Sequence, residues 1–273
     1  MRTSNPDVIG NSGEMPEDTY THGHHASVLR SHNQRTVENS AAYLIPHLVS
    51  GVSVLDVGCG PGTITLEIGE RVAPGRVVGI DVSDDFMPEA AHNVTFEVGD
   101  AYALAFDDDS FDIVHAHQVL QHLSDPVSAL REMRRVVKPD GVVAIRDADY
   151  AAMSWWPADP RLDRWREIYR AVAYKNDAEP DAARRLVDWA TQAGFGEIAP
   201  SSSTWTFALP DDRAWWSETW ATRTTTSAFA HQALEYGLTT ADEQADIAGG
   251  WRAWAAYPTS WWAVLHGQLL CRE

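Results

Sequence analysis

The amino-acid sequence predicts an α/β fold organised around a parallel sheet. Three observations predict it: a short apolar strand at Val54–Val57, a glycine-rich turn directly after it, and a helical pattern over Thr63–Val72. A strand, a glycine turn and a helix N-terminus in this order form a nucleotide-binding crevice at the carboxyl end of the strand. At 273 residues, the chain has the length of one large domain, or of one domain with a cap.

The glycine turn narrows the class of ligand. Gly58, Gly60 and Gly62 let the backbone turn sharply and approach a ligand closely. A dinucleotide fingerprint needs glycine at the sixth position, where this chain has Thr63, and no lysine of a phosphate-binding loop lies nearby. Asp56, inside the strand, disfavours a phosphate and suits a cationic group such as an ammonium.

Composition excludes several classes of function. The net charge of −18 argues against binding to nucleic acids and to anionic membranes. No apolar run approaches the ~20 residues of a membrane helix, and the polar start of the chain lacks a secretory signal. With only two cysteines, we expect a cytoplasmic protein without disulfides or a metal site. All twelve tryptophans lie from Trp155 onward, which predicts an aromatic pocket in the C-terminal half.

Further strands follow the first, and several end in acids. The predicted strands are 76–81, 94–98, 111–117, 142–146, 202–208 and 261–271. Helices are expected over 26–48, 63–72, 83–91, 126–137 and 183–193. Asp81 ends the second strand, where one carboxylate can accept hydrogen bonds from both hydroxyls of a ribose. Asp147 and Asp149 follow the fifth; they either face an acceptor pocket or lie in a solvated loop.

These motifs together resemble class I S-adenosylmethionine-dependent methyltransferases. The resemblance covers roughly residues 50–200 and the final strand, and is nearest to the small-molecule type that includes quinone-biosynthesis enzymes. It implies a Rossmann-like, seven-stranded, mostly parallel sheet with one antiparallel strand, helices on both faces and a helical cap insertion. The motifs that carry it are Asp56–Gly62, Asp81, Gly99-Asp100-Ala101, Leu120-Gln121-His122 and Lys138-Pro139-Asp140-Gly141.

The resemblance also implies a set of residues that bind S-adenosylmethionine. Asp81 would hold the ribose, Asp100 and Ala101 the adenine, and a tyrosine before the first helix would close over the methionine end. The cofactor-binding residues expected on this basis are Tyr20, Asp56, Gly58, Gly60, Asp81, Asp100, Ala101, His117 and Gln118.

Catalysis could need a base if the methyl acceptor carries a proton. The end of the fourth strand faces the methyl group in the family, so His117 and His122 are the candidate catalytic residues, although His122 also suits helix packing. The wider pool adds His24, His231 and Asp149, and the sequence does not choose among them. His22, His24 and His25 lack a nearby partner ligand, so we expect no metal site.

The expected organisation is a mobile N-terminal tail over residues 1–18 and a methyltransferase domain over 19–273. Helical cap insertions are expected at about 151–182 and 210–258, the second carrying Arg223 and His231 as polar candidates for contact with an acceptor. The expected function is in-line methyl transfer to a small molecule under a tryptophan-rich lid. Two alternatives stay open: a protein of the same fold that binds S-adenosylmethionine without methyl transfer, and a NAD-dependent oxidoreductase. Neither nucleic acid nor membrane is an expected partner, and a homodimer is left open.

Overall fold

The strands of the sheet lie side by side in an order that differs from their order in the sequence. The computed structural model describes residues 34–273, and all structural statements concern these. The strands are β1 Val54–Val57, β2 Val77–Asp81, β3 Val94–Val98, β4 Phe111–His117, β5 Val137–Ala148, β6 Ser154–Trp156, β7 Glu197–Phe207 and β8 Trp261–Arg272. The helices are α2 Val37–Ser40, η1 Ala42–His47, α3 Thr63–Val72, η2 Leu120–His122, α4 Pro126–Val136, α5 Pro160–Lys175, η3 Ala182–Arg184, α6 Leu186–Ala193, α7 Pro210–Thr226, α8 Ala228–Glu235 and α9 Ala241–Ala256.

One eight-stranded sheet runs in the order β3-β2-β1-β4-β5-β8-β6, and β7 also pairs with β8. β1 pairs in parallel with β2 and with β4, so the carboxyl ends of these strands meet at one edge of the sheet. β8 runs antiparallel to its neighbours β5, β6 and β7. The predicted mostly parallel sheet with one antiparallel strand is therefore confirmed, and the short β6 is the strand added to the expected seven.

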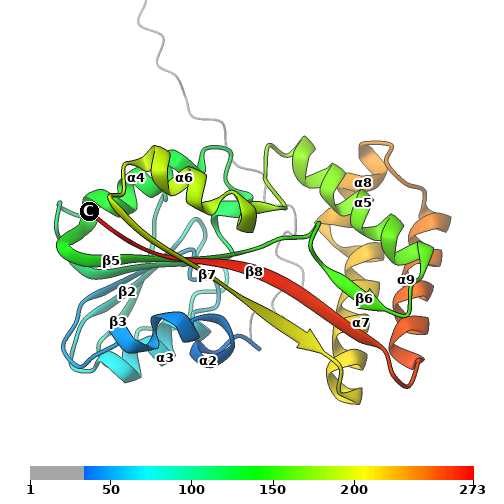
Figure 1. Ribbon diagram of the computed structural model, residues 1–273, viewed down its shortest axis with the longest axis horizontal. Coiled ribbons are helices and arrows are strands. Elements are labelled where there is room, and N and C mark those ends of the chain that lie inside the picture. The colour runs from blue at the N-terminus through cyan, green and yellow to red at the C-terminus, as the bar shows by residue number, and fades with distance from the viewer. Residues whose placement is uncertain (1–33) are drawn as a thin grey trace, which may run out of the picture.

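Helices cover both faces of the sheet, as predicted (Figure 1). On one face, α2, η1 and α3 bury an apolar layer that includes Leu44 and Ile68. On the other face, α4 and α6 bury a second layer that includes Met133 and Leu186. Apolar burial on both faces explains why the central strands read as continuous apolar runs.

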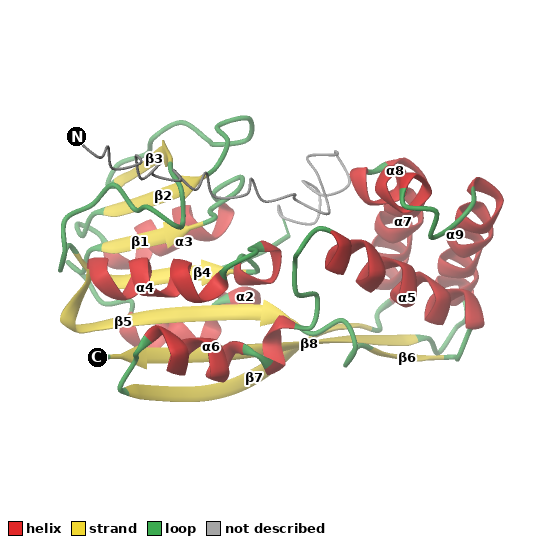
Figure 2. Ribbon diagram, turned by 90° about the horizontal axis from the view of Figure 1, so that it is seen from above, coloured by secondary structure: helices red, strands yellow, loops and turns green. Residues whose placement is uncertain are grey.

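A third apolar core lies outside this three-layer body. Figure 2 shows α5, α7, α8 and α9 gathered beside the extended ends of β6 and β8. Five fully buried tryptophans belong to this core, and Trp165 packs edge to face on two of them, at 4.5 Å from Trp220 and 4.9 Å from Trp251 between ring centroids. Aromatic pairs at such distances and tilts are favourable beyond their buried area. No helix within residues 34–273 is both long and apolar enough to cross a membrane.

The structure corrects three local predictions. The helix expected over 83–91 is absent, because Pro88 lacks a backbone donor and disfavours helical geometry at Met87 before it. Of the helix expected over 26–48, the described part is the short α2 followed by η1, a 3-10 helix that contains Pro46. Trp155 lies in β6 and stacks on Trp262 of β8 at 4.5 Å, and so is not helical.

Candidate functional site

The glycine turn sits at the carboxyl end of β1 and needs its glycines. Gly58 and Gly62 have φ values of 70° and 71°, in the left-handed region that side chains rarely adopt. A β-carbon at Gly62 would lie 2.7 Å from the ring of Phe96, and one at Gly58 would overlap Val119. The turn therefore brings bare backbone to the edge of the sheet, and α3 leaves from it.

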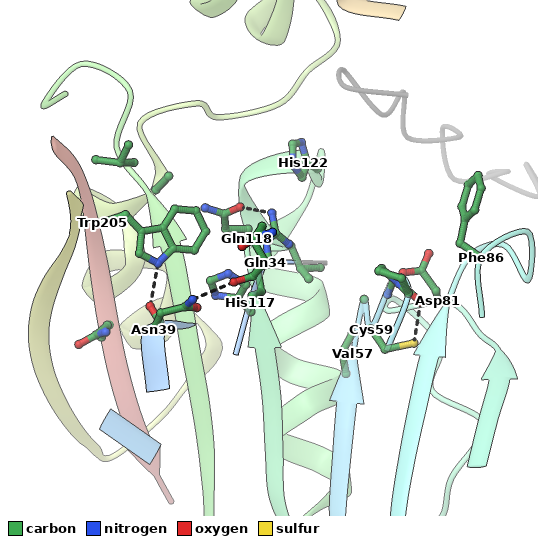
Figure 3. A pocket seen from close by; sticks show the side chains of 18 of the residues that line it. Gln34, Asn39, Val57, Cys59, Asp81, Phe86, His117, Gln118, His122 and Trp205 are labelled. Atoms are coloured by element: carbon green, nitrogen blue, oxygen red, sulfur yellow. Dashed lines mark hydrogen bonds between the residues drawn. The ribbon is translucent and has the colours of Figure 1, made fainter. Parts of the chain in front are cut away.

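Asp81 is fixed beside this turn. Its Oδ2 accepts a hydrogen bond from the backbone N–H of Gly60 at 2.9 Å, and its Oδ1 accepts one from Val82 at 2.8 Å. The carboxylate thus ties the end of β2 to the glycine turn of β1. Figure 3 shows Asp81 beside Cys59 at the carboxyl ends of the strands.

Asp100 and Ala101 follow β3 at the same edge of the sheet. Asp100 Oδ1 accepts a hydrogen bond from the backbone N–H of Tyr102 at 2.8 Å, which holds the turn after the strand. Both residues line the same cavity as the glycine turn and Asp81. The predicted residues of three strand ends are therefore brought together around one space.

Asp56 lies below the turn and away from this space. Its carboxylate is buried, where Oδ2 accepts a hydrogen bond from Thr65 Oγ1 at 2.5 Å and Oδ1 lies 2.7 Å from His115 Nδ1. The residue borders only a small void of about 20 Å³ and does not line the large cavity. Sequence reasoning missed His115, because its partner lies on a strand distant in the chain.

The large cavity has a volume of about 1310 Å³ and extends from the glycine turn to the cap. One end is lined by backbone and by Asp81, Asp100 and Ala101, and the other by aromatic side chains of β7 and α7. His117 and Gln118, at the end of β4, line it between these two ends. A cavity of this size can hold two small molecules side by side.

His117 is buried, and neither of its ring nitrogens has a hydrogen-bond partner among the described residues. Both nitrogens are also shielded from solvent, so the ring meets the cavity through its carbon edge. Burial, followed by the charges of Arg35 and Arg146, holds the pKa of His117 well below its usual range. The ring is therefore neutral at physiological pH.

Gln118 has an unusual backbone and a fully engaged side chain. Its φ of 55° lies in the left-handed region, and its N–H donates to the Arg146 carbonyl at 2.7 Å. Arg35 donates to Gln118 Oε1 at 2.6 Å, and Gln118 Nε2 lies 2.8 Å from His266 Nε2. His266 Nδ1 lies 3.1 Å from the Val264 carbonyl and must carry the proton, so His266 Nε2 accepts from Gln118.

Comparison with known proteins shows which family the chain belongs to. A family model described as a methyltransferase domain matches residues 48–194, more than half of the chain. An uncharacterized methyltransferase of Schizosaccharomyces pombe is 34% identical over 212 residues, covering 72% of this chain and 76% of the relative. The chain belongs to the methyltransferase family.

Two further proteins are similar to this chain in part of the sequence or in fold. A demethylmenaquinone methyltransferase of Lactococcus lactis is 34% identical over 114 residues, 38% of this chain and 45% of that protein, which agrees with the predicted resemblance to quinone-biosynthesis enzymes. Phosphoethanolamine N-methyltransferase 2 of Haemonchus contortus, solved with S-adenosylhomocysteine, has a TM-score of 0.51 at 18% identity and covers 82% of this chain and 49% of that chain. It shares the fold. The protein is an S-adenosylmethionine-dependent methyltransferase, and the NAD-dependent alternative is set aside.

His122 of this methyltransferase is engaged by its neighbour. Gln121 Oε1 accepts from the Ala148 N–H at 3.2 Å, so the Gln121 amide nitrogen is the donor to His122 Nε2 at 3.0 Å. Burial lowers the pKa of His122 to about 3. The lone pair that a base would use is therefore already occupied in this arrangement.

The acids after the fifth strand do not line the cavity of the methyltransferase. Asp149 is buried and forms two 2.6 Å hydrogen bonds with the guanidinium of Arg184. Asp147 accepts from the Gln121 N–H at 3.2 Å, and burial raises its pKa to about 8. Both predictions for these acids are wrong: the side chains are enclosed in protein, so they neither line the cavity nor lie in a solvated loop.

The remaining wall of the cavity is aromatic. Trp205 donates through Nε1 to the Asn39 carbonyl at 2.7 Å, which joins β7 to α2 (Figure 3). Sequence reasoning did not single out Trp205, because its place inside a strand carries no functional signal. Tyr20, expected over the methionine end, and His24 lie outside the described residues. The aromatic residues of this wall are Tyr150, Trp205, Phe207, Trp215, Trp216 and Trp220, and Phe86 and Tyr102 line the cavity elsewhere.

Proposed function

We propose that this methyltransferase transfers a methyl group to a small molecule held beneath the tryptophan-rich cap. The observation that carries the proposal is the single cavity that runs from the glycine turn to the aromatic wall. A methyl donor at the turn and an acceptor against the cap would share one space. Their reacting atoms would then meet near His117 and Gln118, which lie between the two ends.

The residues at the first end fit S-adenosylmethionine. Gly58 and Gly60 present backbone without side chains, so the methionine portion could approach closely. Asp81 accepts backbone hydrogen bonds on both oxygens beside the glycine turn, and a carboxylate there is an acceptor to which two ribose hydroxyls could donate. We assign the adenine to Asp100 and to the backbone N–H of Ala101, which follow β3 at the same edge.

We assign Asp56 a structural role and no contact with the cofactor. Its two oxygens are engaged by Thr65 and His115, so we assign it to holding the glycine turn on α3 and β4. Tyr20 stays a proposed lid residue. The domain limits stay a proposal too, with a tail at 1–18, a domain at 19–273 and insertions at about 151–182 and 210–258.

When bound, S-adenosylmethionine supplies a methyl group on a sulfonium that a nucleophile displaces in line. The protein's share of the work is to place the acceptor atom behind that methyl, and alignment alone can supply ~7–11 kcal/mol. Gln118 is well suited to fix this geometry, because Arg35, His266 and its own backbone all hold it. The cap would exclude water from the aligned pair.

We further propose that turnover does not depend on a side-chain base. His117 has both nitrogens shielded from the cavity, and His122 has its acceptor nitrogen engaged by Gln121. Both rings therefore shape the site rather than remove a proton. The acceptor would have to lose its proton on binding, or react through an atom that carries none.

The test is a search for a methylated product. The full-length protein is incubated with S-adenosylmethionine carrying a deuterated methyl group and a metabolite mixture, and mass spectrometry follows labelled product and S-adenosylhomocysteine together. Stoichiometric formation of both supports the proposal. Tight binding of S-adenosylmethionine with no labelled product would favour the alternative, a binding protein of the same fold. The cytoplasmic location, the absence of nucleic-acid partners and the homodimer stay predictions; light scattering tests the last.

A further inference from the structure

The cap end of the cavity presents flat aromatic faces. Phe207 and Trp216 stack with ring centroids 4.2 Å apart and an angle of 8°, and Trp215 lies 5.9 Å from Phe207. Trp220 stands almost perpendicular to Trp216, at 78°. A wall of parallel and perpendicular rings fits a planar aromatic molecule, which can stack on one ring and meet the edge of another.

Two arginines, Arg35 and Arg223, line the cavity, and a third, Arg146, is buried against the lining residue Trp205. Arg146 is fully buried with its guanidinium 4.8 Å from the ring of Trp205, and Arg35 lies 5.8 Å from that ring. Arg223, on α7, is buried against Trp220 at 5.1 Å and lines the cavity. Guanidinium groups only donate hydrogen bonds, so they suit oxygen atoms and negative charge, and disfavour an ammonium.

Acidic residues also lie near these arginines or line the cavity. Asp147 lies beside Arg146 in sequence, but its pKa is raised by burial to about 8, so it is mostly neutral at pH 7. Asp149 is paired with Arg184, away from the cavity. Asp211 and Asp212 line the cavity in the first turn of α7 and are only partly buried or exposed. Arg146 and Arg223 are more deeply buried than these two acids, and Arg35 is partly buried.

The neighbouring histidines respond to the same positive field. After burial, the charges of Arg35 and Arg146 lower the pKa of His117 further. The same two arginines, again after burial, lower the pKa of His266, and Arg35 lowers that of His122. The charges of the same two arginines thus act on histidines of β4, η2 and β8, although the whole chain carries a net charge of −18.

We infer that the methyl acceptor is a planar aromatic compound with an acidic hydroxyl group, bound as its oxyanion against the arginine-lined aromatic wall. The inference deepens the proposed function and rests on it. It explains how the site works without a side-chain base, because the positive wall releases the hydroxyl proton to bulk water on binding. A lone pair of the oxyanion then forms the new C–O bond while the C–S bond breaks. The electron pair of the broken C–S bond stays on sulfur.

The experiment uses 2-naphthol, whose anion absorbs at longer wavelength than the neutral form. The full-length protein is saturated with S-adenosylhomocysteine, and the absorbance of bound naphtholate is followed against pH. We expect the midpoint of bound 2-naphthol to lie at least one pH unit below that of the free compound. A cation with the same ring system, 2-naphthylmethylammonium, should bind at least tenfold more weakly at pH 8.

Arginine variants test which side chains lower the pH midpoint of bound 2-naphthol. Arg223→Gln should raise the midpoint of bound 2-naphthol and weaken its binding about tenfold, while S-adenosylhomocysteine still binds. Arg252→Gln is the matched control, because Arg252 is exposed on α9 and pairs with Glu218 outside the cavity. Should Arg223→Gln fail to fold, Arg35→Gln tests the same field from α2 and should move the midpoint in the same direction.

The outcomes separate this inference from the proposed function. A cation that binds as tightly as 2-naphthol, an unshifted midpoint, or no binding of either naphthalene would overturn the inference, even if S-adenosylhomocysteine binds normally. Failure of S-adenosylhomocysteine to bind the wild-type protein would instead overturn the assignment of the cofactor residues in the proposed function.

Discussion

Gln118 donates a hydrogen bond from its side-chain amide to Nε2 of His266 at 2.8 Å, although the two residues lie 148 positions apart. The bond joins the end of β4 to β8, between the glycine-turn end and the cap end of the cavity. Because His266 Nδ1 faces a carbonyl, its Nε2 can only accept, and this orients the Gln118 amide with its oxygen toward Arg35. One side chain thus links Arg35, β4 and β8 in the middle of the cavity wall.

The left-handed backbone of Gln118 gives a prediction about stability. Gln118→Ala and Gln118→Gly lose the same side-chain bonds, but glycine adopts a φ of 55° without strain. We expect the glycine variant to have a free energy of unfolding about 1 kcal/mol higher than the alanine variant. Urea denaturation of both proteins measures the difference.

Gln192 supplies the matched control for that pair. It is exposed in α6, where glycine is about 1 kcal/mol less favourable than alanine. The order of the two variants should therefore reverse between the positions. Equal stability of Gln118→Ala and Gln118→Gly would mean that the backbone at this position is not strained.

The two histidines of the site give a prediction about catalysis. His117→Asn and His122→Asn should each lower kcat by less than about tenfold, because neither ring offers an available base nitrogen to the cavity. Loss of a general base would cost ~10²–10⁴-fold. Single-turnover rates with saturating acceptor measure the effect. A loss of a hundredfold or more in either variant, with unchanged affinity for S-adenosylhomocysteine, would identify that histidine as the base.

Asp147 gives a prediction about pH. Burial raises its folded-state pKa to about 8, above its value of ~4 in the unfolded chain. The folded state therefore binds more protons between pH 4 and 8, and Asp147 lowers stability as the pH rises through this range. Asp147→Asn keeps an acceptor oxygen for Gln121 and removes the charge. Its gain in the free energy of unfolding should be at least about 1 kcal/mol larger at pH 9 than at pH 5.

The measurement is urea denaturation of both proteins at the two pH values. The buried histidines titrate in the opposite sense. Because their folded-state pKa is lowered, they stabilise the protein above about pH 6.5, and this stabilisation is lost as the pH falls. Because these histidines are common to both proteins, the comparison isolates Asp147. A gain that does not grow with pH would show that Asp147 is ionised in the folded protein.

Local sequence signals predicted the elements around the glycine turn well. β1, β3, β4 and α3 have the predicted limits, because apolar runs and the glycine turn are properties of neighbouring residues. Asp81, Asp100 and Ala101 gather at one edge of the sheet, since parallel strands that are paired bring their carboxyl ends together. The helix expected over 83–91 failed where one proline outweighed the helical pattern.

Long-range relationships were not readable from the sequence. The partner of Asp56 is His115, on a strand 59 residues away, and no local pattern shows that the two side chains share a face. Tryptophan spacing also did not separate Trp165, which is buried in the cap core, from Trp215, which lines the cavity. Only the packed arrangement of α5, α7 and α9 decides which ring faces which space.

The most direct test of the central claim is calorimetric titration of S-adenosylhomocysteine into the wild-type protein, Asp81→Ala, and the exposed control Asp188→Ala on α6. The claim is that the strand ends around the glycine turn hold the sulfur nucleoside, with Asp81 accepting from the ribose. Wild type and Asp188→Ala should bind one equivalent with equal affinity, and Asp81→Ala should bind more weakly by ~1–3 kcal/mol. No binding to the wild type, or unchanged affinity in Asp81→Ala, would contradict the claim.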